Sequence, residues 1–223
     1  MRSKFDEQLA DLNREMIEMG NGIIHSIKMA IEALISHDAD KARQIMENDI
    51  EIDRQQKRIE GICFNLLIQQ QPVARDLRTV TAAMKMVTDM ERIGDHAADI
   101  SEITVLMGRN SSVEKFEHIR RMATETMMML NHSIEAYVQR DTAKAKEVIK
   151  HDDIVDDLFD EAKKDVIELI LSSPEEGEEA TDLLMIAKYF ERIGDHATNI
   201  AEWVIYSLRT SQSAEAVLSL IHI

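Results

Sequence analysis

Residues 91–97 read ERIGDHA, and the same seven letters return unchanged at residues 191–197. Identity over seven consecutive residues indicates an internal duplication. A second correspondence lies upstream at an offset of 103, where residues 31–33 align with 134–136 and Asp49 aligns with Asp152. The sequence therefore predicts two copies of one unit of about a hundred residues.

Each copy divides into three long segments with helical periodicity, separated by short polar turns. The chain has only 7 Gly, 2 Pro and 4% aromatic residues, which suits long helices and disfavours β-hairpins. Three helices with short connections form an up-down-up bundle. We therefore predict an all-α fold of two tandem three-helix bundles. The predicted parts are a first bundle over residues 1–108, a linker over 108–113, a second bundle over 114–208 and a C-terminal tail over 209–223.

The formal net charge of −16 limits the classes of partner. So acidic a chain repels nucleic acid and anionic membranes, and suits cations or basic protein surfaces. The single cysteine, Cys63, cannot form an internal disulfide and lies on an apolar stripe, where we expect a core residue rather than a nucleophile. Residues 1–16 lack the apolar core of a signal peptide, and no apolar run approaches the roughly 20 residues that span a bilayer. These features predict a cytoplasmic protein without membrane insertion.

Four pairs of acidic residues recur at equivalent places in the two copies. On a helical wheel, at about 100° per residue, each pair falls within an apolar stripe rather than on the polar face. The members of a pair are four residues apart, so like charges lie side by side on one helix. The pairs are Asp49 and Asp53, Glu91 and Asp95, Asp152 and Asp156, and Glu191 and Asp195.

Carboxylates on a partly buried stripe need a compensating group, because an unpaired buried charge is strongly destabilising. Arg92 and Arg192 follow each glutamate but point about 100° away from it, so we expect them to be poor partners within the helix. A cation between the second and third helices of each bundle would compensate both pairs at once, and oxygen ligands suit Mg²⁺, Mn²⁺ or iron. A solvated acidic groove is the alternative, and the repetition of four pairs favours the metal site.

The repeated motif also contains a histidine and a glycine. His96 and His196 lie about 140° from the glutamate direction, so we expect them to contact other helices or to support ligands rather than to bind metal. No histidine follows a glutamate by three residues, which disfavours a ferritin-like oxidase site. Gly94 and Gly194, in mid-helix, indicate either close approach of another backbone or of the metal site, or simple helix packing.

These motifs resemble those of the PhoU family of phosphate-transport regulators. The resemblance runs to about Leu208 and includes residues 71–78 (QPVARDLR) together with the two ERIGDHA segments. It implies that the four acidic pairs are the family's Glu/Asp-x-x-x-Asp motifs, where members bind multinuclear iron, zinc, or manganese and magnesium. Two departures are that Asp99 corresponds to Asn199, so that the two metal sites are expected to differ, and that residues 218–223 do not fit the pattern.

The resemblance further implies a cytoplasmic, usually dimeric accessory protein that restrains phosphate uptake and the phosphate-starvation response. Its implied partners are the ATPase of the phosphate ABC transporter and the associated sensor histidine kinase. We expect a non-enzymatic regulator, in which metal either coordinates phosphate directly or is structural. The alternatives are a metal-dependent phosphohydrolase, since paired metals can activate water, and a purely structural helical scaffold.

Overall fold

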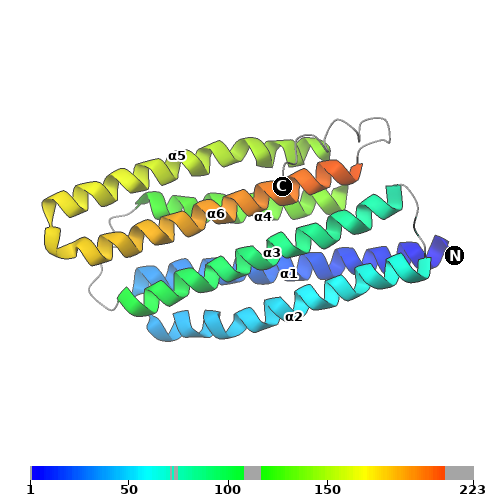
Figure 1. The fold of residues 1–223 in the computed structure, drawn as a ribbon, viewed down its shortest axis with the longest axis horizontal. Helices are drawn as coiled ribbons and strands as arrows, with labels where there is room; N and C mark the ends of the chain where they lie inside the picture. Colours follow the sequence, from blue (N-terminus) through cyan, green and yellow to red (C-terminus); the bar gives the residue numbers. More distant parts are fainter. Residues whose placement is uncertain (1, 71, 73–74, 108–116, 209–223) are drawn as a thin grey trace.

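The computed structural model describes residues 2–70, 72, 75–107 and 117–208, which form helices joined by short turns (Figure 1). The predicted all-α fold is confirmed. The first repeat contains α1 (Arg2–Ser36), α2 (Ala39–Gln70) and α3 (Arg75–Met107). The second repeat contains α4 (Glu117–Gln139), α5 (Thr142–Ser172), the short 3₁₀ helix η2 (Pro174–Glu176) and α6 (Gly177–Leu208). The predicted linker and C-terminal tail lie outside the described residues.

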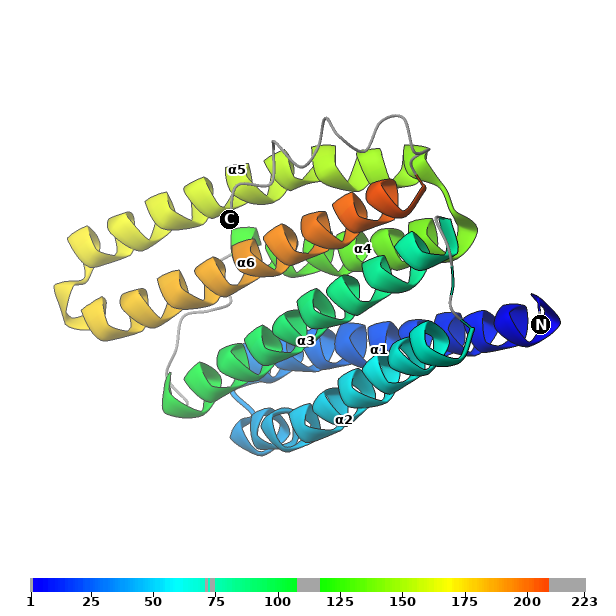
Figure 2. The ribbon, with the colours of Figure 1, turned by 45° about the vertical axis from the view of Figure 1, so that its right-hand side comes forward.

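The two repeats form two three-helix bundles that pack against each other. Within each repeat the three long helices contact one another, and between the repeats α3 packs along α6 and α1 packs on α4. Figures 1 and 2 show α3 and α6 side by side in the middle of the molecule, running in opposite directions, with α2 and α5 at opposite edges. The second repeat is therefore inverted relative to the first, and the equivalent third helices form the centre of the fold.

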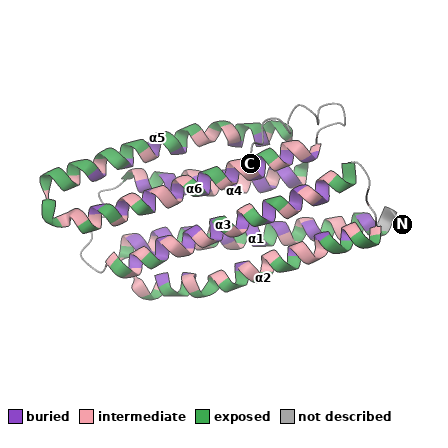
Figure 3. Cartoon of the chain, in the orientation of Figure 1, coloured by how far each residue is buried: buried purple, intermediate pink, exposed green. Residues whose placement is uncertain are grey.

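One continuous apolar core explains why these segments are helical. The buried residues of α1 recur every three or four positions, as an amphipathic helix requires, and include Leu12, Met16 and Met19, all 0% exposed. The core joins buried side chains of all six long helices, and Cys63 is buried within it, as predicted. In Figure 3 exposed residues are prominent along α2 and α5, whereas α3 is buried along much of its length.

The turn between the first and second helices is the same in both repeats. His37 and Arg140 occupy equivalent positions and adopt left-handed backbone conformations, with φ of 52° and 58°. The next residue, Asp38 or Asp141, caps the following helix by accepting a hydrogen bond from the backbone N–H of Lys41 or Lys144, at 3.0 Å and 3.1 Å. The duplication therefore preserves the turn geometry in detail.

No helix in the described part of the chain has the length and hydrophobicity needed to cross a bilayer.

Candidate metal centre

Each repeat places its two acidic pairs on neighbouring helices. The first-repeat cluster consists of Asp49 and Asp53 on α2 and Glu91 and Asp95 on α3. One carboxylate oxygen each from Asp49, Asp53 and Asp95 lies within 4.8 Å of the other two. Among the described residues, this is the one group of three acidic, histidine or cysteine ligands that lie so close together.

The second-repeat cluster is built on the same plan but is more open. It consists of Asp152 and Asp156 on α5 and Glu191 and Asp195 on α6. Glu191 and Asp152 are partly buried, whereas Asp156 and Asp195 are exposed. The prediction that all eight acids lie on partly buried stripes is therefore wrong for these two.

A glycine in each repeat makes room for the carboxylate opposite it. A Cβ atom on Gly94 would lie 3.0 Å from two side-chain carbons of Ile52 and 3.5 Å from Asp49 Oδ1. A Cβ on Gly194 would lie 3.1 Å from Asp152 Oδ1 and 3.3 Å from a Val155 methyl carbon. Of the explanations left open by the sequence, close helix packing and proximity to the acidic site therefore both apply. The glycine lets the neighbouring helix bring an acidic side chain close to the third helix.

In each cluster one aspartate, Asp49 or Asp152, lies where burial disfavours its charged form. Burial is the main cause that raises the pKa of Asp49 to about 6, and the charges of Asp95 and Asp53 contribute. Burial likewise raises the pKa of Asp152 to about 6, with contributions from its acidic neighbours. Burial also raises the pKa of Glu91.

Two buried carboxylate oxygens have no hydrogen-bond partner within the described structure: Oδ1 of Asp49 and Oε2 of Glu191. Buried polar atoms are rarely left unsatisfied, and a bound cation would satisfy such an oxygen. The orphaned oxygen of Asp49 belongs to the close group of three carboxylates. The donor set, the glycine beside it and this orphaned atom therefore fit a hard, oxygen-binding cation at the first-repeat cluster.

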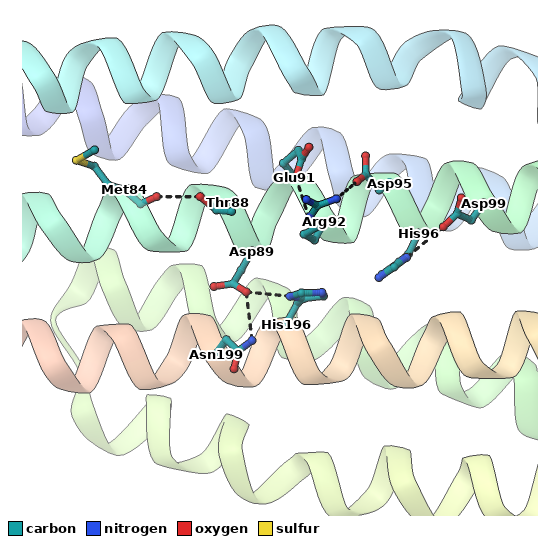
Figure 4. Close-up of polar contacts among 10 residues, drawn as sticks. All are labelled: Met84, Thr88, Asp89, Glu91, Arg92, Asp95, His96, Asp99, His196 and Asn199. Carbon is teal, nitrogen blue, oxygen red and sulfur yellow. Dashed lines mark hydrogen bonds and ion pairs between the residues drawn. The ribbon is translucent and has the colours of Figure 1, made fainter. Parts of the chain in front are cut away.

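The first-repeat cluster contacts a basic side chain that was expected to be a poor partner. Arg92 Nη1 lies 3.1 Å from Asp95 Oδ2, and Arg92 Nε lies 3.6 Å from Glu91 Oε2 (Figure 4). The expectation was wrong for Arg92 because it considered only the angle to the glutamate, whereas Asp95 lies three residues further on, about 60° from Arg92 on the wheel, where side chains of one helix commonly pair. Its side chain is 57% exposed, so it contacts the acids of α3 from the solvent side.

In the second repeat a lysine contacts the cluster. Lys188 Nζ lies 2.5 Å from Glu191 Oε1, one turn away on α6. The pKa of Asp156 on α5 is raised, mainly by burial and by the charge of Glu191, and the charge of Lys188 opposes this rise. Lys188 was not among the residues predicted from the sequence. Comparison of the repeats would have revealed it, because Thr88 occupies the equivalent position in the first repeat.

The two histidines of the repeated motif face the interface between the repeats. In Figure 4 Glu91 and Asp95 point toward α2, whereas His96 points toward α6. His96 Nδ1 lies 3.2 Å from Asp99 Oδ2, and His196 Nδ1 lies 2.8 Å from Asp89 Oδ1 on the other repeat. The two imidazole centroids are 5.7 Å apart. As predicted, both side chains contact groups other than the acidic clusters.

The fold and the site define a class of all-helical protein: two inverted copies of a three-helix unit, each with carboxylates facing one another across its second and third helices. The family model described as the PhoU domain matches residues 16–104 and 119–204. The chain belongs to the PhoU family, as the resemblance had indicated.

Relatives match over nearly the whole chain. The "Phosphate-specific transport system accessory protein PhoU homolog" of Clostridium acetobutylicum is 35% identical, covering 95% of this chain and 97% of its own. The protein of the same name from Synechocystis sp. is 36% identical, covering 92% and 91%. The crystal structure of PhoU from Pseudomonas aeruginosa has a TM-score of 0.84 and 29% identity, covering 92% of this chain and 99% of that one. That of the phosphate transport system regulatory protein PhoU from Streptococcus pneumoniae has a TM-score of 0.82 and 27% identity, covering 91% and 96%.

Proposed function

We propose that the chain is a regulatory accessory protein of phosphate transport. In this role it restrains phosphate uptake and the phosphate-starvation response through protein contacts. The observation that carries the proposal is the match, over nearly the full length of both chains, to relatives named as accessory proteins of the phosphate-specific transport system. The proposed partners are the ATPase of the phosphate ABC transporter and the sensor histidine kinase of the phosphate regulon. The proposed setting is the cytoplasm, with the chain acting as a homodimer.

The proposal includes metal cations at the acidic clusters. Asp49, Asp53 and Asp95 would hold the first cation, supported by their close carboxylate oxygens and by the orphaned Oδ1 of Asp49. When bound, iron, manganese, magnesium or zinc would supply positive charge that offsets the repulsion among carboxylates of two helices. The chain's own residues would thereby fix α2 against α3 and stabilise the bundle surface that a partner contacts.

Deletion of the gene in its own host tests the regulatory role. In phosphate-rich medium the deletion should raise phosphate uptake and switch on a phosphate-starvation reporter, and the wild-type chain should restore both to low levels. A chain with Asp49→Asn and Asp53→Asn should restore them less completely if metal at the first-repeat cluster matters. Unchanged uptake and reporter activity after the deletion would contradict the proposed function.

The metal component is tested separately on purified protein without an affinity tag. Elemental analysis should find bound metal in the wild-type chain and less in the Glu91→Gln/Glu191→Gln double variant. Absence of metal from both proteins, with no thermal response to added Mn²⁺, Mg²⁺, Fe²⁺ or Zn²⁺, would leave the clusters as acidic docking grooves. Phosphomonoester hydrolysis by the metal-loaded chain, lost in the double variant, would instead favour a phosphohydrolase.

A further inference from the structure

The repeats differ at one position that faces the acidic residues. Thr88 and Lys188 are equivalent, each three residues before the glutamate of its cluster. Thr88 is exposed, and its hydroxyl donates to the Met84 carbonyl oxygen at 3.2 Å (Figure 4). Lys188, by contrast, directs its ammonium to Glu191 at 2.5 Å. At this position the second repeat therefore carries an ammonium that contacts its cluster, whereas the first repeat carries a neutral hydroxyl that bonds to the backbone of its own helix.

The lysine is held in place from the neighbouring helix. Its Nζ lies 5.2 Å from the centroid of the Phe159 ring on α5, a cation–π contact. The equivalent of Phe159 in the first repeat is Gln56, which has no aromatic ring. The ammonium and the ring that supports it therefore occur together in the second repeat and are both replaced in the first.

The two bases approach their clusters from different positions. Lys188 contacts Glu191 on α6 and lies 5.2 Å from the centroid of the Phe159 ring on α5, so its ammonium lies at the contact between the two helices that carry the acids. Arg92 contacts Glu91 and Asp95 of its own helix, α3, through a side chain that is 57% exposed. The cross-helix position of Lys188 resembles that expected of a bound cation, whereas Arg92 contacts its cluster from the solvent side of α3.

We propose that Lys188 is a built-in cation of the second-repeat cluster that lowers its affinity for divalent metal, so that the first-repeat cluster fills first. The inference rests on the metal component of the proposed function and adds an order of filling to it. A divalent cation entering the second-repeat cluster must displace the ammonium from Glu191 or lie close to it, and two positive charges so close together repel each other. The same acidic motif thereby serves one high-affinity and one low-affinity site.

A repeat-exchange experiment tests this order. Metal-free protein is titrated with Mn²⁺, and free Mn²⁺ is followed by electron paramagnetic resonance. The wild-type chain should show a tight and a weak class of sites, with Asp49→Asn removing the tight class and Asp152→Asn removing the weak one. Lys188→Thr should tighten the weak class by about tenfold or more, and Thr88→Lys should weaken the tight class by a similar factor.

The matched control is Lys163→Thr. Lys163 Nζ lies 5.6 Å from the same Phe159 ring but pairs with Asp160 at 2.6 Å, outside the cluster. This variant removes the same charge nearby and should leave both Mn²⁺ affinities within about twofold of wild type, because Lys163 pairs with Asp160 rather than with an acid of the cluster. Circular dichroism establishes that each variant is folded.

Equal affinities of the two classes in the wild-type chain would overturn the inference, as would an unchanged weak class in folded Lys188→Thr. An equal gain in Mn²⁺ affinity from Lys163→Thr would also overturn it, because the effect would then depend on total charge rather than on the position of Lys188. Failure of every protein to bind Mn²⁺ would overturn this inference together with the metal component. The regulatory role would still be decided by the deletion experiment.

Discussion

The first-repeat cluster presents three close carboxylate oxygens to one point and is contacted by a largely exposed arginine. The second-repeat cluster has the same acids at equivalent positions, but two of them are exposed and a lysine reaches into it from one turn away. In both, a glycine brings the second helix close to the third. The duplication has therefore preserved the helix packing that positions the acids. The basic side chains that contact the acids differ between the repeats, because the residues around the acids have been substituted.

The largest expected effect comes from filling the space beside Gly94. Gly94→Leu should destabilise the protein by about 3 kcal/mol, because its Cβ already falls 3.0 Å from Ile52 and further atoms must force α2 from α3. Gly194→Leu should cost about as much, since its Cβ falls 3.1 Å from Asp152 Oδ1. Urea unfolding monitored by circular dichroism measures both values.

Gly61→Leu is the control for these variants. Gly61 also lies within a helix, but a Cβ there meets nothing within 4 Å, so the substitution should stabilise the protein by up to about 1 kcal/mol. If Gly94→Leu were as stable as Gly61→Leu, the helices would not be packed as closely as described. A loss at only one of Gly94 and Gly194 would show that the two repeats have diverged in packing as well as in charge.

The next largest effect is the stability gained on binding metal, which distinguishes the two clusters. At about a hundredfold excess over the dissociation constant of the tight site, a cation should stabilise the wild-type chain by about 2.7 kcal/mol. Asp49→Asn should abolish this gain, because it removes a member of the close group of three carboxylates. Asp152→Asn should retain it, since the tight site lies in the other repeat. Calorimetric melts with Mn²⁺ and with chelator provide the measurement, and equal losses in both variants would show that the clusters are equivalent.

A smaller effect should appear with pH in the absence of metal. The pKa of Asp49 and that of Asp152 are both raised from 3.8 to about 6. A raised pKa in the folded state means that folding favours the protonated form, so this contribution to stability is fully present below about pH 4 and is lost as the pH rises through about 6. Because both groups are partly exposed, each should contribute about 1 kcal/mol or less.

The test compares urea unfolding in chelator at about pH 5 and about pH 7.5. Asp49→Asn and Asp152→Asn should each reduce the fall in stability, and by similar amounts, because burial is the main cause of both shifts. The difference includes the substituted group and the smaller effect of its charge on neighbouring acids, such as that of Asp49 on Glu91. A pH dependence identical to that of the wild type in both variants would contradict the raised pKa values.

The features predicted correctly from the sequence are those that depend on local periodicity. Exact recurrence of seven residues revealed the duplication, and the helical period placed Glu91 and Asp95 on the face that meets α2. The inverted packing of α3 on α6 was not predicted, because it depends on which buried faces of distant segments fit together. The role of Arg92 was missed because only its angle to Glu91 was considered, whereas Asp95, three residues further on, lies about 60° from it on the wheel and within ordinary reach.

The substitutions that distinguish the two clusters are visible in the sequence, but the sequence does not show that they contact each other. Alignment of the two copies pairs Gln56 with Phe159 and Thr88 with Lys188. Within each repeat, the first of these positions lies on the second helix and the other lies on the third helix. Only the fold brings them together across one helix–helix contact. Differences between the repeats are therefore informative when two substituted positions that contact each other across neighbouring helices are considered together.

An effect of similarly small size concerns the polar contacts around the two central histidines. Asp89 links the repeats, because its Oδ1 lies 2.8 Å from His196 Nδ1 and accepts a hydrogen bond from Asn199 Nδ2 at 3.2 Å. Asp99 contacts His96 within its own helix and is more exposed, at 38% against 16% for the side chain of Asp89. Asp89→Ala should therefore cost about 1 kcal/mol, and Asp99→Ala less than about 0.5 kcal/mol. Equal values in urea unfolding would contradict a stabilising role for the Asp89 link, and would attribute the association of the repeats to apolar packing of α3 on α6.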